Sequence, residues 1–390
     1  MTAAGTGVTP LVDAPYPMRR WVFVDALDRY DVDLGDSHAE CRSVASLGPL
    51  PDLPLDYGVD RGTRPLRESV AGLYRGSPER VVITHGAQEA LHLLFSTLLG
   101  PGDKVVTVQP GWRQSVDLPS LLGCRVEVVQ LGSDLVVDVD RVAAAAGTDA
   151  QVVAVTSPSN PTGRRTSTED LRALARLVRR TGGWLVVDEE YRVDLAGSVA
   201  AEPDARAVSV SGLSKIHGVP GLRTGWMYGP PDLVSACAER KHLTTVSNSV
   251  LTEALAGVVL ARRDEHVREY RELCAQGLRV LEDWADRHRG AVRLVPPDGT
   301  PFAWLWLDTG ESALSYCRRV LDAGVLLMPG ETLGGRGGFR VTFARHRDAL
   351  ADGLRRAGEV LARTPPARDR ADPTAATPDP IPDHPWNGAR

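Results

Sequence analysis

The chain has 390 residues, of which 43% are hydrophobic and 24% are charged, with a formal net charge of −5 at pH 7. Length and composition are those of a globular protein with a sizeable core and two or more lobes. The acidic balance excludes a basic field for nucleic acid, and no apolar run approaches the ~20 residues of a membrane span. We therefore expect a small-molecule partner, with no nucleic acid and no membrane.

The five cysteines are dispersed along the chain and form neither a Cys-x-x-Cys pair nor a cluster with histidine. A scattered, odd set of this kind is typical of a reduced compartment and argues against a structural zinc site. The N-terminal segment lacks the charged and then apolar layout of a signal peptide. We therefore expect a cytoplasmic protein that binds no metal.

Short β-rich runs alternate with helical patterns from about residue 80 to residue 230. A helix is expected over 86–99, and a second helix follows Ser167, which forms a capping-box pattern with Asp170. Several of the runs between them are nearly continuous valine, as in strands covered on both faces of a parallel sheet. Strand, helix and strand at this spacing predict βαβ crossovers. The predicted strands are 104–109, 125–130, 151–156, 184–188 and 207–211.

The pattern changes from about residue 256 onward. Arginine-rich helices are predicted around 260–290 and 311–324, with strands over 302–308 and 339–344. This combination predicts a second, smaller α+β lobe. The residues after Thr364 are dense in proline and cannot bury enough apolar surface to order themselves.

Two segments of the first lobe have the chemistry of an anion site. The segment ITHGAQEAL (83–91) opens a helix at Gly86, Ala87 and Gln88, where free N–H groups favour negative charge. Arg223 follows two glycines and suits a bidentate grip on a phosphate. The alternatives are a plain strand-to-helix turn and a surface arginine beside a loop.

Polar residues also follow two of the predicted strands. Asn160 lies in SPSNPTG (157–163), and Asp188 and Tyr191 lie in DEEY (188–191). Ligands of open α/β sheets bind outside the carboxyl ends of the strands, so these side chains are expected to converge. Lys215, in SGLSKIHGVPGLRTGW (211–226), is either a solvated loop lysine or a reactive amine. Asn160 could instead form only a turn, and Asp188 only a helix cap.

The ordered set Asn160, Asp188, Tyr191, Lys215 and Arg223 resembles the fold-type I enzymes that use pyridoxal 5′-phosphate. These form the large aminotransferase superfamily that includes aspartate aminotransferase, and the resemblance runs from about residue 33 to residue 345. It implies an α/β fold: a large domain with a mostly parallel seven-stranded sheet flanked by helices, plus a smaller α+β C-terminal domain. The implied divisions are an N-terminal arm contributing to the small domain and active site (1–45), the large cofactor-binding domain (46–255), the small domain (256–364) and a disordered proline-rich tail (365–390).

The resemblance also implies roles for single residues. Lys215 would hold the cofactor as a Schiff base. Asp188 would keep the pyridine nitrogen protonated, and Asn160 and Tyr191 would bind the ring's phenolic oxygen. Trp112, in QPGWRQS, stands where the family places an aromatic residue stacked on the ring.

Further matches concern the cofactor phosphate and the substrate. Tyr57 matches a tyrosine that reaches the neighbouring subunit's phosphate, which implies a homodimer with shared active sites. Arg340 matches the arginine that clamps the substrate α-carboxylate, although it could be an ordinary strand arginine. The phosphate itself would be held by Gly86, Ala87, Gln88, Ser214 and Arg223.

Three positions depart from the common pattern. Gly212 stands where the family usually has a phosphate-binding serine or threonine, so either Ser211 substitutes or the phosphate loses a contact. His217 replaces an aromatic residue or asparagine and is expected to be a packing residue. The segment DLGDSHAE resembles a natural-product subgroup that includes capreomycidine synthase and oxygen-using arginine hydroxylases. His38 is thus a candidate second acid–base group near neutral pH, or a solvated loop histidine.

The activity implied is transamination of an amino acid or amino-acid derivative with a 2-oxo acid, in a natural-product (antibiotic) pathway. Lys215, neutral in an apolar setting, would move a proton from the substrate Cα. The alternative is a non-transaminating reaction of the same fold, namely decarboxylation with oxidative deamination, elimination or cyclisation. A remoter one is a ligand sensor without catalysis. Regulators of that kind carry an N-terminal helix-turn-helix domain, and fewer than ~50 residues precede the large lobe here.

Overall fold

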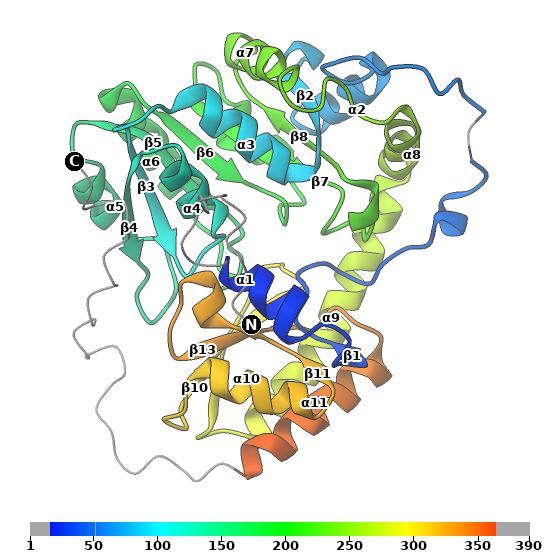
Figure 1. The fold of residues 1–390 in the computed structure, drawn as a ribbon, viewed down its shortest axis with the longest axis vertical. Helices are drawn as coiled ribbons and strands as arrows, with labels where there is room; N and C mark the ends of the chain where they lie inside the picture. The colour runs from blue at the N-terminus through cyan, green and yellow to red at the C-terminus, as the bar shows by residue number, and fades with distance from the viewer. Residues whose placement is uncertain (1–15, 51, 364–390) are drawn as a thin grey trace, which may run out of the picture.

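The computed structural model describes residues 16–50 and 52–363 (Figure 1). The tail predicted over 365–390 lies outside the described residues, as does the beginning of the predicted arm. Two sheet-containing parts make up the described chain. None of its helices is both long enough and apolar enough to cross a lipid bilayer.

The larger part contains a seven-stranded sheet in the order β2-β8-β7-β6-β5-β3-β4. β8 runs antiparallel to both of its neighbours, and the remaining pairs are parallel. This arrangement confirms the predicted, mostly parallel sheet. Its strands are β2 (Val81–His85), β3 (Lys104–Gln109), β4 (Arg125–Gln130), β5 (Ala150–Thr156), β6 (Trp184–Asp188), β7 (Ala207–Gly212) and β8 (Thr224–Tyr228).

The valine runs form strands because both faces of the sheet are covered. On β5, Val153 packs into one apolar cluster and Val152 into the cluster on the opposite face, and Val187 and Val186 of β6 alternate in the same way. β4 differs from this pattern. It is the last strand of the sheet, and its side chains are mostly exposed or half-buried.

Helices cover both faces of this sheet (Figure 1). α3 (Gly86–Leu98) and α7 (Pro231–Lys241) pack into one apolar cluster, and α2 (Arg64–Leu73), α5 (Val139–Ala146), α6 (Thr168–Thr181) and α8 (Val250–Ala261) into the other. α4 (Gln114–Leu121) lies beside α3. The predicted start of α6 is confirmed, because the Ser167 side chain accepts a hydrogen bond from the Asp170 N–H at 3.0 Å. Gly182 ends the helix in the left-handed conformation, with φ of 79°.

The smaller part is an antiparallel sheet with helices against it, as predicted. Its strand order is β12-β13-β10-β9, and its apolar core includes Trp284, Tyr316 and Phe339. The strands are β9 (Val292–Val295), β10 (Phe302–Leu307), β12 (Met328–Pro329) and β13 (Gly338–Thr342), and the helices are α9 (Arg263–Arg287), α10 (Ala313–Asp322) and α11 (Arg347–Ala362).

The N-terminal segment joins the smaller part and then crosses to the larger one. After α1 (Pro17–Arg20), the short strand β1 (Val32–Asp33) pairs in parallel with β11 (Val325–Leu326). Further along, the Ala39 N–H donates to the Lys215 carbonyl at 3.3 Å, and the Arg42 N–H donates to the Gly218 carbonyl at 2.8 Å. Residues 34–42 therefore lie between the small sheet and the loop that carries Lys215.

Candidate active site

A cavity of about 210 Å³ opens at the carboxyl ends of β5, β6 and β7. The structure brings most of the predicted site residues together in its walls. Gly86 and Arg340 adjoin it, whereas Tyr57 lies apart from it. The lining residues are Asp36, His38, Ala87, Gln88, Leu91, Trp112, Asn160, Asp188, Glu190, Tyr191, Ser214, Lys215, Pro220 and Arg223.

The sheet explains why residues distant in sequence meet here. Asp188 is the last residue of β6, Asn160 follows β5, and Lys215 follows β7, so all three leave the same edge of parallel strands. The Asn160 amide donates to the Tyr191 hydroxyl at 3.3 Å. Trp112 reaches the cavity from the segment after β3, where its indole N–H donates to Gln88 Oε1 at 3.3 Å.

Lys215 points into the cavity, and its Nζ donates a hydrogen bond to Ser37 Oγ at 2.9 Å. Burial lowers the pKa of this amine, but interactions with the acidic groups of Tyr191, Glu190 and Asp36 outweigh burial and leave the pKa raised. The surroundings of Lys215 are therefore acidic, whereas the sequence predicted an apolar setting.

Asp188 is buried beside a second carboxyl, that of Glu190. Burial raises the pKa of Asp188, and the negative charge of Glu190 raises it further, whereas Lys215 lowers it. The Asp188 carboxyl accepts one backbone hydrogen bond, from the Glu190 N–H at 3.1 Å. A carboxyl in this state is stabilised as an anion by a further cationic partner, such as a protonated ring nitrogen.

The beginning of α3 and the Arg223 side chain form an anion cradle. Gly86 has φ of +74°, and a Cβ on it would lie 2.5 Å from Arg223 Nη2, so only glycine lets the guanidinium come this close. A Cβ on Gly225 of β8 would lie 2.5 Å from the Ala87 nitrogen. Arg223 itself has φ of +49°, an uncommon conformation for a non-glycine residue. Helix N–H groups and a guanidinium at one point fit a phosphate ester.

His38 forms a close pair with Asp36 at the mouth of the cavity. The two side chains meet at 2.9 Å, from His38 Nε2 to Asp36 Oδ2, and His38 Nδ1 lies 2.6 Å from the Ala39 carbonyl oxygen. Burial opposes protonation, but the hydrogen bond with Asp36 overcomes it and raises the pKa of His38 to about 10. The imidazole is thus a cation near neutral pH, whereas the sequence alone suggested titration in that range.

The remaining predicted residues occupy different surroundings. Arg340 is buried, and its Nη1 donates to Asn160 Oδ1 at 2.5 Å and its Nη2 to the Gly35 carbonyl, while its Nε has no partner among the described residues. Tyr57 is 90% exposed on the loop before α2. Ser211 does not replace the missing phosphate contact, because its hydroxyl is buried and donates to the Glu189 carbonyl at 3.3 Å.

Sequence reasoning missed three polar residues of the site, namely Asp36, Ser37 and Glu190. Asp36 and Ser37 precede His38 directly, so the Asp-Ser-His order was the available signal. Glu190 stands between Asp188 and Tyr191, in the quoted DEEY segment, and lines the same cavity. No local sequence pattern marks Glu190 as a site residue, because the position of its side chain depends on contacts with another strand.

A lysine, a buried acid and an arginine beside a helix N-terminus at the carboxyl edge of such a sheet fit a pyridoxal phosphate-dependent enzyme. The chain belongs to the class I and II aminotransferase family, whose sequence profile matches residues 56–357. Its cofactor is pyridoxal 5′-phosphate. The fold, the family and the cofactor predicted from the sequence are thereby confirmed.

Two relatives and one solved structure show the similarity. The aspartate/prephenate aminotransferase of Thermus thermophilus is 32% identical over 340 residues, covering 79% of this chain and 83% of that protein. The capreomycidine synthase of Streptomyces vinaceus is 31% identical over 341 residues, covering 85% and 87%. The structure of the pyridoxal phosphate-dependent cyclase OrfR superposes with a TM-score of 0.83 at 27% identity, covering 92% of this chain and 99% of that one.

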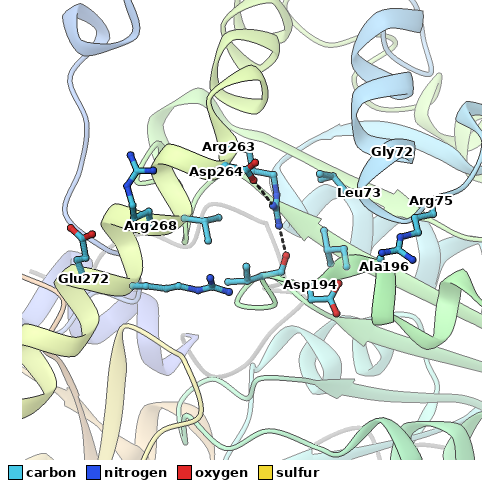
Figure 2. Close-up of a pocket in the computed structure, with 13 residues that line it drawn as sticks. Gly72, Leu73, Arg75, Asp194, Ala196, Arg263, Asp264, Arg268 and Glu272 are labelled. Atoms are coloured by element: carbon cyan, nitrogen blue, oxygen red, sulfur yellow. Dashed lines mark hydrogen bonds and ion pairs between the residues drawn. The ribbon is translucent and has the colours of Figure 1, made fainter.

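A larger and more open hollow of about 580 Å³ lies between α2, residues 193–196 and α9 (Figure 2). Its walls carry arginines and carboxylates, and Arg263 of α9 contacts the neighbouring Asp264 and reaches across to the Val193 carbonyl. None of the predicted site residues lines this hollow. Charged side chains that face water in this way are typical of a surface groove.

His217 is buried outside the active-site cavity. Its ring packs edge-on against His266 with centroids 5.9 Å apart, and its Nδ1 has no hydrogen-bond partner among the described residues. Burial lowers the pKa of His217 to about 3, with smaller contributions from the charges of His266 and Arg263. These contacts are those of a packing residue.

We predict that His217 makes the fold acid-sensitive. Because the folded pKa of about 3 is below the ordinary value of 6.5, the unfolded chain binds this proton more tightly. Stability should therefore fall as the pH decreases from about 6.5 toward 3, and His217→Gln should fall less steeply over this window. Thermal unfolding at a series of pH values measures the difference, with the exposed His346→Gln as the control. Equal slopes for wild type and His217→Gln would contradict the assignment.

Proposed function

We propose that the enzyme transfers the amino group of an α-amino acid, or of a derivative of one, to a 2-oxo acid. The observation that carries the proposal is that Lys215, Asp188 and Arg223 all line the same cavity. Arg223 lies there beside Gly86, at the start of α3. Membership of the aminotransferase family supports the reaction class.

The residues present fit the cofactor at each of its ends. Lys215 would hold its aldehyde carbon, Asp188 its ring nitrogen, and Asn160 with Tyr191 its phenolic oxygen. Arg223, Ser214 and the first N–H groups of α3 would hold its phosphate, and Trp112 would cover one ring face. Pyridoxal phosphate supplies a carbonyl that condenses with amines and a ring that withdraws electrons from the bonds at Cα.

The chain's own groups would then direct the reaction. Asp188 keeps a proton on the ring nitrogen through a charge-assisted hydrogen bond. The unprotonated amine of Lys215 would remove the proton from the substrate Cα, and the acidic neighbours that raise its pKa would make it a stronger base. Arg340 orients the substrate through its carboxylate, which the unpartnered Nε supports.

Arg340→Lys is expected to raise KM for the amino-acid substrate by about tenfold to hundredfold, with a smaller change in kcat. A lysine keeps the charge but loses the planar fork that binds a carboxylate through two N–H groups. Steady-state kinetics with a fixed 2-oxo acid measures the effect, and the exposed Arg336→Lys is the matched control. An unchanged KM in Arg340→Lys would contradict the carboxylate clamp.

A second candidate is a non-transaminating reaction at the same Cα, such as decarboxylation with oxidative deamination, elimination or cyclisation. The observation that favours it is the Asp36–His38 pair, which places a cationic imidazole in the cavity wall near Lys215. Similarity to capreomycidine synthase and to the cyclase OrfR supports this alternative, within natural-product metabolism.

One experiment separates the two candidates. Purified enzyme is incubated with amino acids and 2-oxoglutarate, with and without oxygen, and the products are analysed by mass spectrometry. Amino transfer yields a new 2-oxo acid and glutamate in equal amounts, and this is the expected result. Loss of carbon dioxide, hydroxylation or ring closure without glutamate would replace transamination with the second candidate.

We also infer a cytoplasmic homodimer in which Tyr57 reaches the partner's phosphate site. The exposed ring of Tyr57 stands apart from its own cavity, and other apolar side chains are exposed in the same loop and beyond α7, among them Leu55 and Leu243. All five cysteines are free, as in a reduced compartment. A monomer in sedimentation experiments at micromolar concentration would contradict the dimer.

A further inference from the structure

Glu190 is a carboxyl in the cofactor cavity to which the mechanism gives no role. It lies between Asp188 and Tyr191 and lines the cavity together with Lys215 and Arg223. No hydrogen bond or ion pair to its carboxylate is found among the described residues. An acid in such a place, beside a site for a phosphate dianion, requires a physical explanation.

The position of the Glu190 carboxyl is fixed by the glycine opposite it. A Cβ on Gly212, the last residue of β7, would lie 3.0 Å from Glu190 Oε1, 3.1 Å from the Thr224 carbonyl oxygen and 3.2 Å from Gly225 Cα. The carboxyl thus occupies the space that a side chain at position 212 would take. Gly225 in turn packs against the Ala87 nitrogen, so this space adjoins the start of α3.

Four charged or polar groups influence the protonation state of Glu190. Arg223 and Lys215 carry positive charge, Asp188 carries a carboxyl, and the beginning of α3 contributes partial positive charge. Burial raises the pKa of Glu190, and the charges of Lys215 and Arg223 offset this only in part. A phosphate dianion in the cradle would favour the neutral acid further, because a like charge disfavours ionisation.

We propose that Glu190, as the neutral acid, donates a hydrogen bond to the cofactor phosphate in place of the hydroxyl that Gly212 lacks. The inference rests on the proposed function and on the position of the Glu190 carboxyl against Gly212. Each binding event then requires one proton on Glu190. Cofactor affinity should accordingly fall as rising pH removes that proton.

The test is a titration of cofactor-free protein with pyridoxal phosphate, followed by absorbance and protein fluorescence, from about pH 6 to about pH 9. Glu190→Gln donates a hydrogen bond at every pH. The ratio of wild-type to Glu190→Gln dissociation constants should therefore rise by up to about tenfold per pH unit once Glu190 ionises. Because Glu190 also raises the pKa values of Lys215 and Asp188, their titration is followed separately in both proteins through the Schiff-base absorbance.

Three further variants test whether a hydroxyl at position 212 can replace the Glu190 carboxyl. Glu190→Ala should weaken binding by about tenfold at low pH, because a hydrogen bond to a charged group is lost. Gly212→Ser should also weaken binding, because its Cβ meets the Glu190 carboxyl. The double variant Glu190→Ala/Gly212→Ser should recover part of the affinity, since removal of the carboxyl relieves the shortest of the three contacts and the serine hydroxyl can take its place. Glu202→Gln, at an exposed ion pair with Arg172, is the control for loss of one negative charge.

The ³¹P chemical shift of the bound phosphate gives a second readout that does not depend on activity. It should respond to pH in the wild type and less in Glu190→Gln. Tighter cofactor binding by Glu190→Ala than by the wild type would show an ionised, repulsive carboxylate and overturn the inference. Identical pH dependence of cofactor binding in wild type and Glu190→Gln would overturn the inference about Glu190 but not the proposed function. A wild-type protein that forms no Schiff base would overturn both.

Discussion

Replacement of Lys215 by alanine is expected to abolish covalent cofactor binding and to lower the rate of amino transfer by about 10³-fold or more. Among the described residues that line the cavity, this amine is the only nucleophile that can condense with an aldehyde, and we propose that the same atom moves the Cα proton. The visible absorbance of the lysine–pyridoxal Schiff base should disappear. Absorbance spectra and single-turnover rates measure the two effects separately.

The choice of control is simple because the chain has only three lysines, at positions 104, 215 and 241. Lys104 forms an ion pair with Asp149 at 3.4 Å, away from the cavity, so Lys104→Ala should keep both the absorbance and the rate. Lys241 is buried and donates to the Ile83 carbonyl at 2.9 Å, so its replacement would test the fold instead. Full absorbance in Lys215→Ala would contradict the site assignment.

Asp188→Asn is expected to lower kcat by about 10²-fold to 10⁴-fold while the Schiff-base absorbance remains. Asparagine has nearly the same shape but cannot carry the negative charge that holds a proton on the ring nitrogen. The loss should therefore appear in the bond-breaking step and not in covalent attachment. Rapid-mixing kinetics of Cα proton removal, with deuterated substrate, measure that step.

Two comparisons make the Asp188 result specific. Asp264→Asn removes a carboxylate that is 99% exposed in the open hollow of Figure 2, and it should leave kcat unchanged. A cofactor analogue methylated at the ring nitrogen carries a permanent positive charge there, so it should restore part of the rate in Asp188→Asn. A loss of less than about tenfold in Asp188→Asn would contradict the role of this acid.

The valine-rich strands of the large sheet could be predicted from the sequence to within a residue at their ends, because hydrophobic periodicity alone specifies them. β8 was not predicted, since Thr224–Tyr228 follows the Lys215 loop directly and contains a glycine. The β1–β11 pair was also missed. Two-residue strands are formed by tertiary contact, and no local pattern marks them.

Prediction of the site from the sequence has the same limit, because contacts formed only in three dimensions leave no local pattern. Asn160, Asp188 and Tyr191 were predictable because each follows a recognisable strand, and parallel strands bring their carboxyl ends together. The acidic surroundings of Lys215 were not, because Asp36 arrives from a segment that crosses between the two sheets. The substitution at Gly212 was visible in the sequence, whereas its contact with Glu190 exists only in three dimensions.

The most direct test of the central claim is reduction of the holoenzyme with borohydride, followed by peptide mapping by mass spectrometry. Reduction fixes the cofactor to whichever amine carries it, and only three lysines compete for it. We expect one pyridoxyl group per chain, on the peptide that contains Lys215. A label on Lys104 or Lys241, or none on any lysine, would contradict it.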